Sequence, residues 1–346
     1  MKRINTLSGV VEKLKVDAIL LESPLDLLYL THVPLSYGKL FVTKDGAVLF
    51  TDHRYLLEVK VKTKIPTHLM SSENMNNFFS RKKIKRIAFI GDKTSYHHAL
   101  ELKENAGKII FLSINDPLRD IRLIKDDEEI KAMKKAAKIA FSGYEYVVKH
   151  LKEGITEKEV ALMFEIFCLQ HGAEKLSFES IICFGKNSAC PHHRCDNTKL
   201  RANDIVLMDV GVVYNGYCSD MTRTIFFHCK DKTLKYFDVC VKEAYQAAVN
   251  LCRAKTSLEM VDEAAREILA TRGVKQYFLH RLGHGIGMEV HEFPRIGKDE
   301  NVILQPNMLI TIEPGLYKEK LGGVRYENTL LITASGYKEI TALENA

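Results

Sequence analysis

One strand-turn-strand segment, from Asp204 to Phe227, constrains the fold of this chain more than any other. Ile205 to Val213 is an apolar, β-branched run that only Asp209 and Gly211 interrupt, which is the pattern of a strand covered on both faces. Asn215-Gly216 follows, and this pair favours a two-residue hairpin turn because both central positions of that turn need positive φ. The segment therefore predicts a buried hairpin that carries acidic side chains.

The turn predicts the register of the two strands. If Asn215-Gly216 is the loop, Tyr214 pairs with Tyr217 and Asp209 lies opposite Thr222. Asp220 is then the diagonal neighbour of Asp209 on one sheet face, at roughly 7–8 Å. Two half-buried carboxylates repel each other, so a cation should compensate them.

We therefore predict a metal site at this hairpin. The alternative is a structural Asp pair that Arg223 or backbone amides satisfy.

The length of 346 residues exceeds one ordinary core and predicts two domains, which 46% hydrophobic residues are sufficient to fill. Residues 1–122 are typical of a smaller α/β domain, with a strand at Ala18–Leu21 and a hairpin around Asp45-Gly46. We see no catalytic constellation there. The charged stretch RLIKDDEE marks the boundary, and Asp126 or Asp127 is expected to cap the first helix of residues 123–346.

Residues 123–346 repeat one arrangement of helices and strands. In the first half, a long helix and a second helix with a capping box at Thr156 and Glu159 precede a strand pair. In the second half, a helix across residues 231–252 and another with a capping box at Thr256 and Glu259 precede a strand pair. We infer a duplicated ααββ unit of α+β class, whose halves pool four acids in one cleft. These acids are Asp209, Asp220, Glu313 and Glu327.

The last strand, GGVRYENTLLIT, places Arg325, Glu327 and Thr329 on one face because side chains alternate along a strand. Arg325 is then either only the ion-pair partner of Glu327 or a group that also orients a ligand or substrate carboxylate.

Three histidines, His280, His284 and His291, lie between these acids in HRLGHGIGMEVHEFPRIG. The glycines argue for a loop with close backbone approach rather than a helical zinc motif, and spacing alone does not select which histidine joins the acids. An oxygen-rich site with one imidazole suits a pair of Mn²⁺, Co²⁺, Fe²⁺ or Zn²⁺ ions. Carboxylates that bridge two such ions would hold a shared water and lower its pKa.

The remaining cluster is FGKNSACPHHRC, residues 184–195. Cys190, His192, His193 and Cys195 could form a zinc knot, but a single Cys-x4-Cys spacing is a weak pattern. We favour a loop histidine that hydrogen-bonds substrate, with Pro191 restricting the backbone before it.

Charge and cysteine usage exclude several classes. The formal net charge of +6 comes without a nucleic-acid motif, so nucleic acid is not an expected partner. No apolar run could span a bilayer or serve as a signal peptide, so neither a membrane nor export is expected. Eight cysteines without framework spacing fit reduced thiols, and we expect a cytoplasmic protein.

Taken together, these segments resemble the proline-specific metallopeptidases, aminopeptidase P and prolidase, of the pita-bread (creatinase/aminopeptidase) fold. The resemblance is carried by CPHH, LMDVGVVYNGYCSDMTRT, HRLGHGIGMEVHEFPRIG, ITIEPGLY and GGVRYENT in that order. It is dense over residues 123–346. For the first 122 residues it consists of size, α/β character and the FTDHRY and RLIKDDEEI stretches, as for a creatinase-type N-terminal domain.

The resemblance implies that two divalent metal ions, with Mn²⁺ as first choice, are bound by Asp209, Asp220, His284, Glu313 and Glu327. It also implies that His192, His280 and His291 line the substrate pocket and that Arg325 supports the site. In the family, Glu313 doubles as proton acceptor for the attacking water.

We therefore expect a metal-dependent exopeptidase acting on proline-containing peptides. Our first choice is an Xaa-Pro aminopeptidase that uses a metal-bridging hydroxide. The nearest alternative is an Xaa-Pro dipeptidase (prolidase), and a remote one is a non-catalytic peptide-binding module. A homodimer is also expected.

Overall fold

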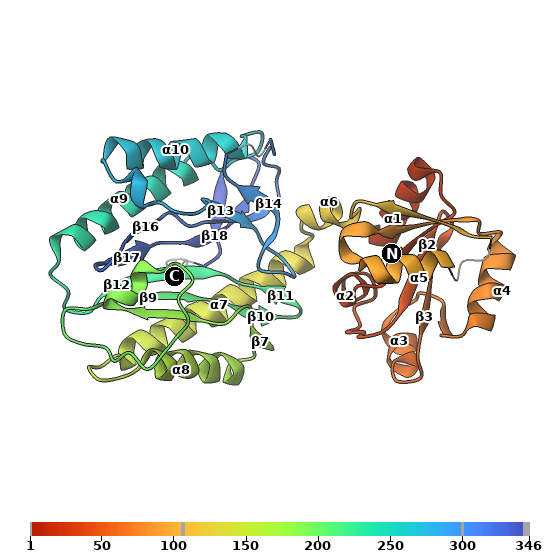
Figure 1. Ribbon diagram of the computed structural model, residues 1–346, viewed down its shortest axis with the longest axis horizontal. Helices are drawn as coiled ribbons and strands as arrows, with labels where there is room; N and C mark the ends of the chain where they lie inside the picture. The colour runs from red at the N-terminus through yellow and green to blue at the C-terminus, as the bar shows by residue number, and fades with distance from the viewer. Residues whose placement is uncertain (1, 105–107, 299–300, 342–346) are drawn as a thin grey trace. The chain divides into compact units, whose positions relative to one another are not determined.

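The computed structural model describes residues 2–104, 108–298 and 301–341 (Figure 1). The chain divides into two compact units, Met1–Ile121 and Arg122–Ala346. The predicted division was between residues 122 and 123. We call these the N-terminal and C-terminal units and describe each by itself.

The N-terminal unit is a six-stranded mixed sheet in the order β4-β3-β2-β1-β5-β6. The central strand β1 is buried along its whole length, pairing antiparallel with β2 and parallel with β5. Phe41 of β2 and Phe50 of β3 meet edge to face, with ring centroids 5.8 Å apart. The strands are β1 (Ala18–Leu21), β2 (Lys39–Thr43), β3 (Gly46–Thr51), β4 (Thr67–Leu69), β5 (Arg86–Ile90) and β6 (Ile110–Ile114).

Along the chain, helices alternate with most of the strands of this unit, as expected for an α/β domain. The hairpin predicted around Asp45-Gly46 joins β2 to β3. Gly46 has a φ of 130°, which side chains other than that of glycine rarely allow. The helices are α1 (Lys2–Leu14), α2 (Pro24–Thr31), α3 (Leu56–Lys62), α4 (Ser72–Lys82) and α5 (Tyr96–Glu104); α6 (Leu118–Leu123) contains the point of division.

In the C-terminal unit, strands lie between two helix pairs (Figure 1). Helices α7 (Asp127–His150) and α8 (Glu157–Gln170) precede the strands of the first half, and α9 (Lys232–Val249) and α10 (Leu258–Thr271) precede those of the second. Each helix pair contributes to a hydrophobic core with the strands of its own half: Phe164 and Val206 belong to one core, and Val241 and Ile310 to the other. This is the predicted duplicated ααββ arrangement.

The first-half strands form two three-stranded sheets, β12-β9-β8 and β11-β10-β7, and most second-half strands form the sheet β14-β13-β15-β18-β19. The first-half strands are β7 (Lys175–Leu176), β8 (Ile181–Phe184), β9 (Ile205–Val210), β10 (Val212–Tyr214), β11 (Tyr217–Cys218) and β12 (Met221–Phe226). The second-half strands are β13 (Gly283–Gly285), β14 (Glu292–Ile296), β15 (Leu309–Ile312), β16 (Gly315–Lys318), β17 (Gly322–Arg325), β18 (Asn328–Ile332) and β19 (Tyr337–Glu339). The 3-10 helices are η1 (Gly91–Lys93), η2 (Gly185–Ala189) and η3 (Lys275–Tyr277).

The helix starts test the predicted caps. Asp126 caps α7, and the predicted capping box of Thr156 and Glu159 opens α8. The capping box predicted at Thr256 is wrong, because Ser257 caps α10 and accepts from the Glu259 amide. The Thr256 carbonyl instead accepts from Leu304 N at 2.8 Å, so the helix begins one residue later.

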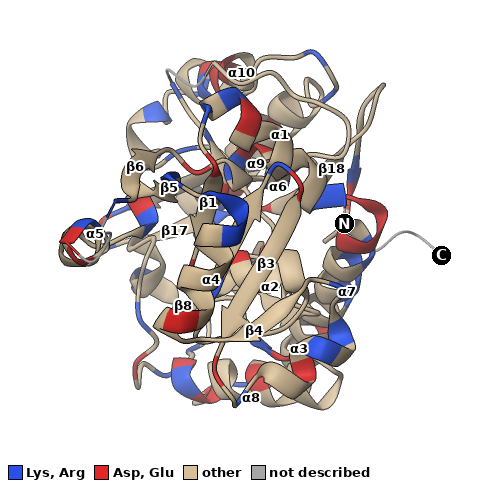
Figure 2. Cartoon of the chain, turned by 90° about the vertical axis from the view of Figure 1, so that its right-hand side faces the viewer, with Lys and Arg blue, Asp and Glu red and all other residues tan. Residues whose placement is uncertain are grey.

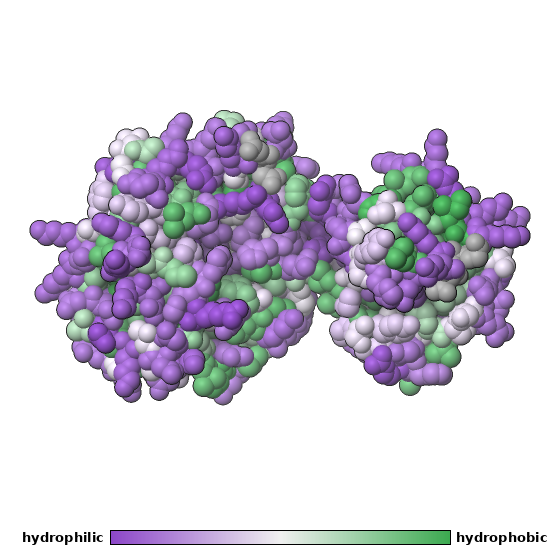
Figure 3. All heavy atoms as spheres, in the orientation of Figure 1, coloured by the Kyte–Doolittle hydropathy of each residue, from purple (hydrophilic) through white to green (hydrophobic). Residues whose placement is uncertain are grey.

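The surface carries charges of both signs, as the mixed blue and red residues of α3 and α5 illustrate (Figure 2). The face seen in Figure 3 is mostly hydrophilic, with hydrophobic residues in smaller groups. Across the described ranges, none of the helices combines the length and apolar character needed to cross a membrane.

Candidate active site

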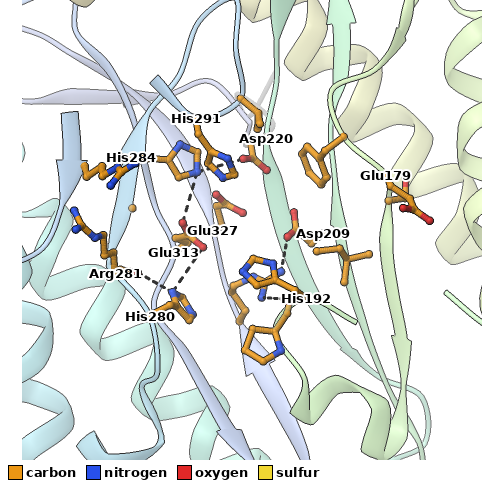
Figure 4. Close-up of a pocket in the computed structure, with 18 of the residues that line it drawn as sticks. Glu179, His192, Asp209, Asp220, His280, Arg281, His284, His291, Glu313 and Glu327 are labelled. Atoms are coloured by element: carbon orange, nitrogen blue, oxygen red, sulfur yellow. Dashed lines mark hydrogen bonds and ion pairs between the residues drawn. The ribbon is translucent and has the colours of Figure 1, made fainter. Parts of the chain in front are cut away.

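A pocket of about 940 Å³ opens in the C-terminal unit and is lined by strands and loops from both of its halves. Volumes of this size suit a small ligand. Figure 4 shows acidic and imidazole side chains directed into it from several elements. All of the site residues predicted from the sequence line it, namely His192, Asp209, Asp220, His280, His284, His291, Glu313, Arg325 and Glu327.

The first-half acids take their places from the predicted hairpin. Tyr214 pairs with Tyr217 and Thr222 lies opposite Asp209, so the predicted register is confirmed. Asn215 and Gly216 have φ values of 48° and 76°, as the expected turn requires. The single strand expected over residues 205–213 is split at Gly211, where a Cβ atom would lie 2.0 Å from the Ser219 carbonyl oxygen.

The second-half acids lie where strands end. Glu313 follows β15, and Glu327 lies between β17 and β18, so the predicted return strand is interrupted there. Tyr326 N bonds to the Pro314 carbonyl and Glu327 N to the Thr222 carbonyl, which turns the chain toward the first half. Arg325 and Glu327 still face the same pocket, as their spacing predicted.

His284 lies in the short strand β13, so the predicted loop at this position is wrong. The predicted close backbone approach is present. A Cβ atom on Gly283 would lie 2.0 Å from the Thr311 carbonyl oxygen, and one on Gly285 would lie 2.4 Å from that of Phe293. Glycines here allow β13 to pack tightly and bring His284 among the acids.

Imidazole and carboxylate atoms converge at the centre of the pocket (Figure 4). His284 Nε2 lies 3.6 Å from Asp220 Oδ2 and 3.6 Å from Glu313 Oε1. Asp220, His284 and Glu327 each offer a ligand atom, and these three atoms lie within 4.8 Å of one another. Asp209 is on the opposite wall, beside His192.

Burial makes this cluster electrostatically costly without a cation. Burial raises the pKa of Asp220 well above its ordinary range, and the neighbouring Glu327 carboxylate raises it further. Burial likewise raises the pKa of Glu313, again with help from Glu327. The pKa of Glu327 is raised to about 8, by burial and then by Asp209.

The donor set fits divalent metal ions. His284 Nδ1 lies 3.0 Å from the Gly285 carbonyl, so this nitrogen carries the proton and donates, and the Nε2 lone pair faces two carboxylates. Two lone-pair groups facing each other at 3.6 Å repel unless a cation lies between them. In the described chain, the buried atoms Asp209 Oδ1 and Asp220 Oδ1 also have no hydrogen-bond partner.

Arg325 supplies a positive charge to one of the pocket's acids. It forms an ion pair with Asp209, not with Glu327, so that alternative is wrong. Its Nε donates to Thr222 Oγ1 at 3.0 Å and its Nη1 to the Tyr317 hydroxyl at 2.9 Å. Arg223, considered as a partner of the Asp pair, instead donates to the Glu327 carbonyl and to Asn328 Oδ1 at 2.5 and 2.7 Å.

The other pocket histidines have different surroundings. His280 Nδ1 donates to the Arg281 carbonyl at 2.7 Å, and its Nε2 accepts from the Tyr317 hydroxyl at 2.9 Å. Burial lowers the pKa of His280 to about 4, so it is neutral at pH 7. The ring of His291 packs edge to face on His284, with centroids 4.4 Å apart.

Two site residues, Thr222 and Tyr317, were not identified from the sequence. Thr222 donates to Glu327 Oε2 at 2.7 Å, and Tyr317 links His280 to Arg325. Alternation along β12 puts Thr222 on the face of Asp220, which is a signal that could have found it. Tyr317 gave no such signal, because its role depends on contacts with the distant His280.

The zinc knot weighed for residues 190–195 is not formed. Cys190 is exposed, and the Cys195 thiol donates to the Ser180 carbonyl at 3.1 Å. His193 instead lies with Glu157 and Asp196, apart from the pocket's acids.

Comparison with known proteins matches both units. The model of metallopeptidase family M24 matches residues 131–334, and that of the creatinase/prolidase N-terminal domain matches residues 3–124. A curated Xaa-Pro dipeptidase from Pyrococcus horikoshii is 34% identical over 346 residues, covering 99% of this chain and 97% of the relative.

Solved structures agree. An Xaa-Pro dipeptidase from Bacillus anthracis has a TM-score of 0.94 at 31% identity, over 100% of this chain and 98% of that one. An X-Pro aminopeptidase from Thermotoga maritima has a TM-score of 0.91 at 28% identity, over 97% of this chain and 99% of that one.

Proposed function

This chain belongs to metallopeptidase family M24, and on that premise we propose that it is an Xaa-Pro dipeptidase. It would hydrolyse the bond before proline in a dipeptide and release a free amino acid and proline. The observation that carries the proposal is the meeting of His284 Nε2 with the Asp220 and Glu313 carboxylates in a pocket of small-ligand size.

The five residues Asp209, Asp220, His284, Glu313 and Glu327 would hold two divalent metal ions, with Mn²⁺ as first choice. Carboxylates and one imidazole make an oxygen-rich donor set, which is the type that suits such ions. When bound, the ions supply Lewis-acid polarisation of the scissile carbonyl and lower the pKa of water.

Glu313 is the residue proposed to move the proton. Its carboxylate lines the pocket, with Oε1 3.6 Å from His284 Nε2, and a carboxylate within reach of a bound water can act as its general base. It would accept a proton from the attacking water and deliver it to the prolyl nitrogen as the C–N bond breaks. The hydroxyl group stays on the carbonyl carbon, which completes the carboxyl group of the released amino acid.

The remaining side chains would orient the substrate and the site. Arg325 holds Asp209 in place through their ion pair. His192 and His291 lie at the pocket wall, where neutral or charged imidazoles can hydrogen-bond a peptide carbonyl. His280 has both ring nitrogens engaged, so we assign it to holding Tyr317 as well as lining the pocket.

The dipeptidase alternative has more support than the aminopeptidase that the sequence analysis placed first. The 34% identical relative is named Xaa-Pro dipeptidase, whereas the X-Pro aminopeptidase structure is 28% identical. The pocket wall also carries Arg194, Arg281 and Arg295. Cationic groups on the wall of a peptide pocket favour a substrate that carries a carboxylate close to the bond that is cleaved, as a dipeptide does.

A substrate-length series tests the proposal. Metal-stripped protein reloaded with Mn²⁺ would be offered Ala-Pro, Ala-Pro-Ala and Ala-Pro-amide, with Pro-Ala as the control peptide. We expect cleavage of Ala-Pro, with kcat/KM at least roughly tenfold above that for the two substrates without the adjacent carboxylate. Equal cleavage of Ala-Pro-Ala would reinstate the aminopeptidase, and no cleavage of any Xaa-Pro bond would contradict both.

The homodimer expected from the sequence stays a prediction. Light scattering of the purified protein measures it: a mass near twice the 39.4 kDa of one chain supports it, and a monomer mass contradicts it.

A further inference from the structure

Glu157 is a fully buried acid at the start of α8, outside the pocket. Its carboxylate accepts four hydrogen bonds. Oε1 accepts from Phe184 N at 2.7 Å and from Asn187 Nδ2 at 2.9 Å. Oε2 accepts from His193 Nε2 at 2.7 Å and from Asp196 N at 3.1 Å. The two oxygens are thus saturated by donors.

All four donors belong to one segment, residues 184–196, which runs from the end of β8 through η2 to the CPHH sequence. Backbone amides at both ends of this segment, Phe184 N and Asp196 N, bond to the one carboxylate. Glu157 therefore holds the two ends of the segment together, so that the residues between them form a loop. We call residues 184–196 the His192 loop.

The two adjacent histidines of the His192 loop differ in their partners. Both line the pocket, but His193 Nε2 donates to the buried Glu157, whereas His192 lies beside Asp209 (Figure 4). The backbone of Pro191, which precedes them, accepts from Arg325 Nη1 at 3.4 Å. The hydrogen bond of His193 to Glu157 therefore restricts where His192, the preceding residue of the backbone, can lie in the pocket.

The loop is also fastened to the second half of the unit. Ser188 Oγ accepts from Gly323 N at 2.9 Å and donates to the Gly185 carbonyl at 2.5 Å. Gly323 is in β17, the strand that carries Arg325. The loop thus has one anchor on α8 and another on β17, the strand that carries Arg325 and its ion pair with Asp209.

We propose that Glu157 is a positioning residue that holds the His192 loop so that His192 meets the substrate. The inference rests on the proposed function, because it takes His192 to contact a peptide substrate. Glu157, His193 and Asp196 also offer three ligand atoms that lie close together. Four donors at 2.7 to 3.1 Å already bond to the Glu157 carboxylate, so we assign it to holding the loop and not to binding a metal.

A carboxylate is needed because the pattern of donors requires four acceptor positions. In Glu157→Gln, the amide NH₂ would face donors: either Phe184 N and Asn187 Nδ2 or His193 Nε2 and Asp196 N. One end of the loop would lose its anchor. A displacement of a substrate-contacting group by about 1 Å can cost roughly 100-fold in rate.

The test is a double-mutant cycle on kcat/KM for Ala-Pro, with E157Q, H192A and the double variant. If Glu157 acts through His192, E157Q lowers kcat/KM by roughly 10- to 100-fold in the wild-type background and by less than about twofold once His192 is alanine. The single variants E157Q and H192A should both bind metal with wild-type stoichiometry.

Glu159→Gln is the matched control. Glu159 is in the same first turn of α8, but its carboxylate bonds only to Thr156 in the described structure, at 2.8 Å to N and to Oγ1. We expect kcat/KM within about twofold of wild type for E159Q, since its change affects a helix cap and not the loop.

A second pair of variants covers the case that E157Q does not fold. His193→Gln keeps a donor toward Glu157 and should retain most activity, whereas His193→Leu removes the donor and should lose roughly tenfold or more. Both leave the other three donors of Glu157 in place.

The outcomes separate the two claims. If the wild-type protein does not cleave Ala-Pro, the proposed function is wrong. If the wild type cleaves Ala-Pro, multiplicative losses in the cycle, an H192A variant as active as wild type, or H193L as active as H193Q would each overturn the role of Glu157.

Discussion

Arg325, from β17 in the second half of the C-terminal unit, forms an ion pair with Asp209, from β9 in the first half. The pair joins two strands that are far apart in the sequence at the wall of the pocket. It occupies Asp209 Oδ2 and leaves Oδ1 buried without a hydrogen-bond partner in the described chain. Arg325 therefore orients one predicted metal ligand and leaves an oxygen of it open to an ion.

Replacing Arg325 by lysine tests this orientation. Lysine keeps the charge but cannot bond to Asp209, Thr222 and Tyr317 together, because its ammonium group lacks the fork of the guanidinium. We expect kcat/KM for Ala-Pro to fall roughly 30- to 100-fold, equivalent to about 2–3 kcal/mol. Tyr317→Phe, which removes one acceptor of Arg325, should cost roughly tenfold or less. An unchanged R325K enzyme would show that this network does not act in catalysis.

Asp220→Asn should abolish activity while the fold persists. The substitution removes a charged ligand atom that lies 3.6 Å from His284 Nε2. We expect kcat/KM to fall by roughly 10³-fold or more, since metals supply several kcal/mol of transition-state stabilisation. Circular dichroism should be unchanged. Asp238→Asn, in an exposed ion pair with Lys242, is the control and should keep full activity.

The metal-free protein should lose stability as pH rises from 6.5 to 8. The pKa of Glu327 is raised to about 8 by burial, so the folded state keeps a proton in this range that the unfolded state has already released. A group that binds protons more tightly when folded stabilises the fold at lower pH, and this stabilisation is lost as pH rises through the folded pKa. We expect the unfolding free energy to fall by roughly 1–2 kcal/mol across the window.

Thermal unfolding midpoints of metal-stripped protein at pH 6.5 and 8 measure this change. Buried histidines such as His284, whose pKa is lowered to about 4, have the opposite effect, because their neutral folded form is favoured as pH rises toward their ordinary pKa of about 6.5. Most of that effect therefore falls below the window. The matched variant Glu327→Gln should show a flatter profile, and added Mn²⁺ should stabilise the wild type more at pH 8 than at pH 6.5. A midpoint that rises with pH in the metal-free wild type would contradict the assignment.

A buried ion pair outside the metal site should matter for stability. Lys125 Nζ lies 3.3 Å from Glu292 Oε2, and both side chains are almost fully buried. Lys125→Met removes one of the positive charges that stabilise the buried Glu292 carboxylate, and we expect the free energy of unfolding to fall by about 3 kcal/mol. This value is near the low end for a broken buried ion pair, because Arg122 Nη2 stays 3.2 Å from Glu292 Oε1. Urea denaturation measures this, with the exposed Lys242→Met as control at below about 0.5 kcal/mol.

Local patterns in the sequence were enough to predict much of this structure. The Asn215-Gly216 turn placed Thr222 opposite Asp209 because turn geometry and strand alternation leave one register. The resemblance to proline-specific pita-bread metallopeptidases, with a creatinase-type N-terminal domain, is confirmed by the family matches and by structures covering nearly the whole chain.

Contacts between the halves could not be predicted in the same way. Pairing of Arg325 with Asp209 rather than Glu327 depends on how two distant hairpins meet, and so does the Tyr317 link to His280. The cap at Ser257 instead of Thr256 reflects a backbone bond from Leu304, which local pattern does not contain. Selection of His284 among three histidines came from the resemblance and not from spacing.

The most direct test of the central claim is anomalous diffraction from crystals soaked in Mn²⁺, recorded on both sides of the manganese absorption edge. We predict two peaks in the pocket, enclosed by Asp209, Asp220, His284, Glu313 and Glu327, and their loss in the D220N variant. Peaks located elsewhere, or a pocket without anomalous signal at saturating Mn²⁺, would contradict a metal centre built from these five side chains.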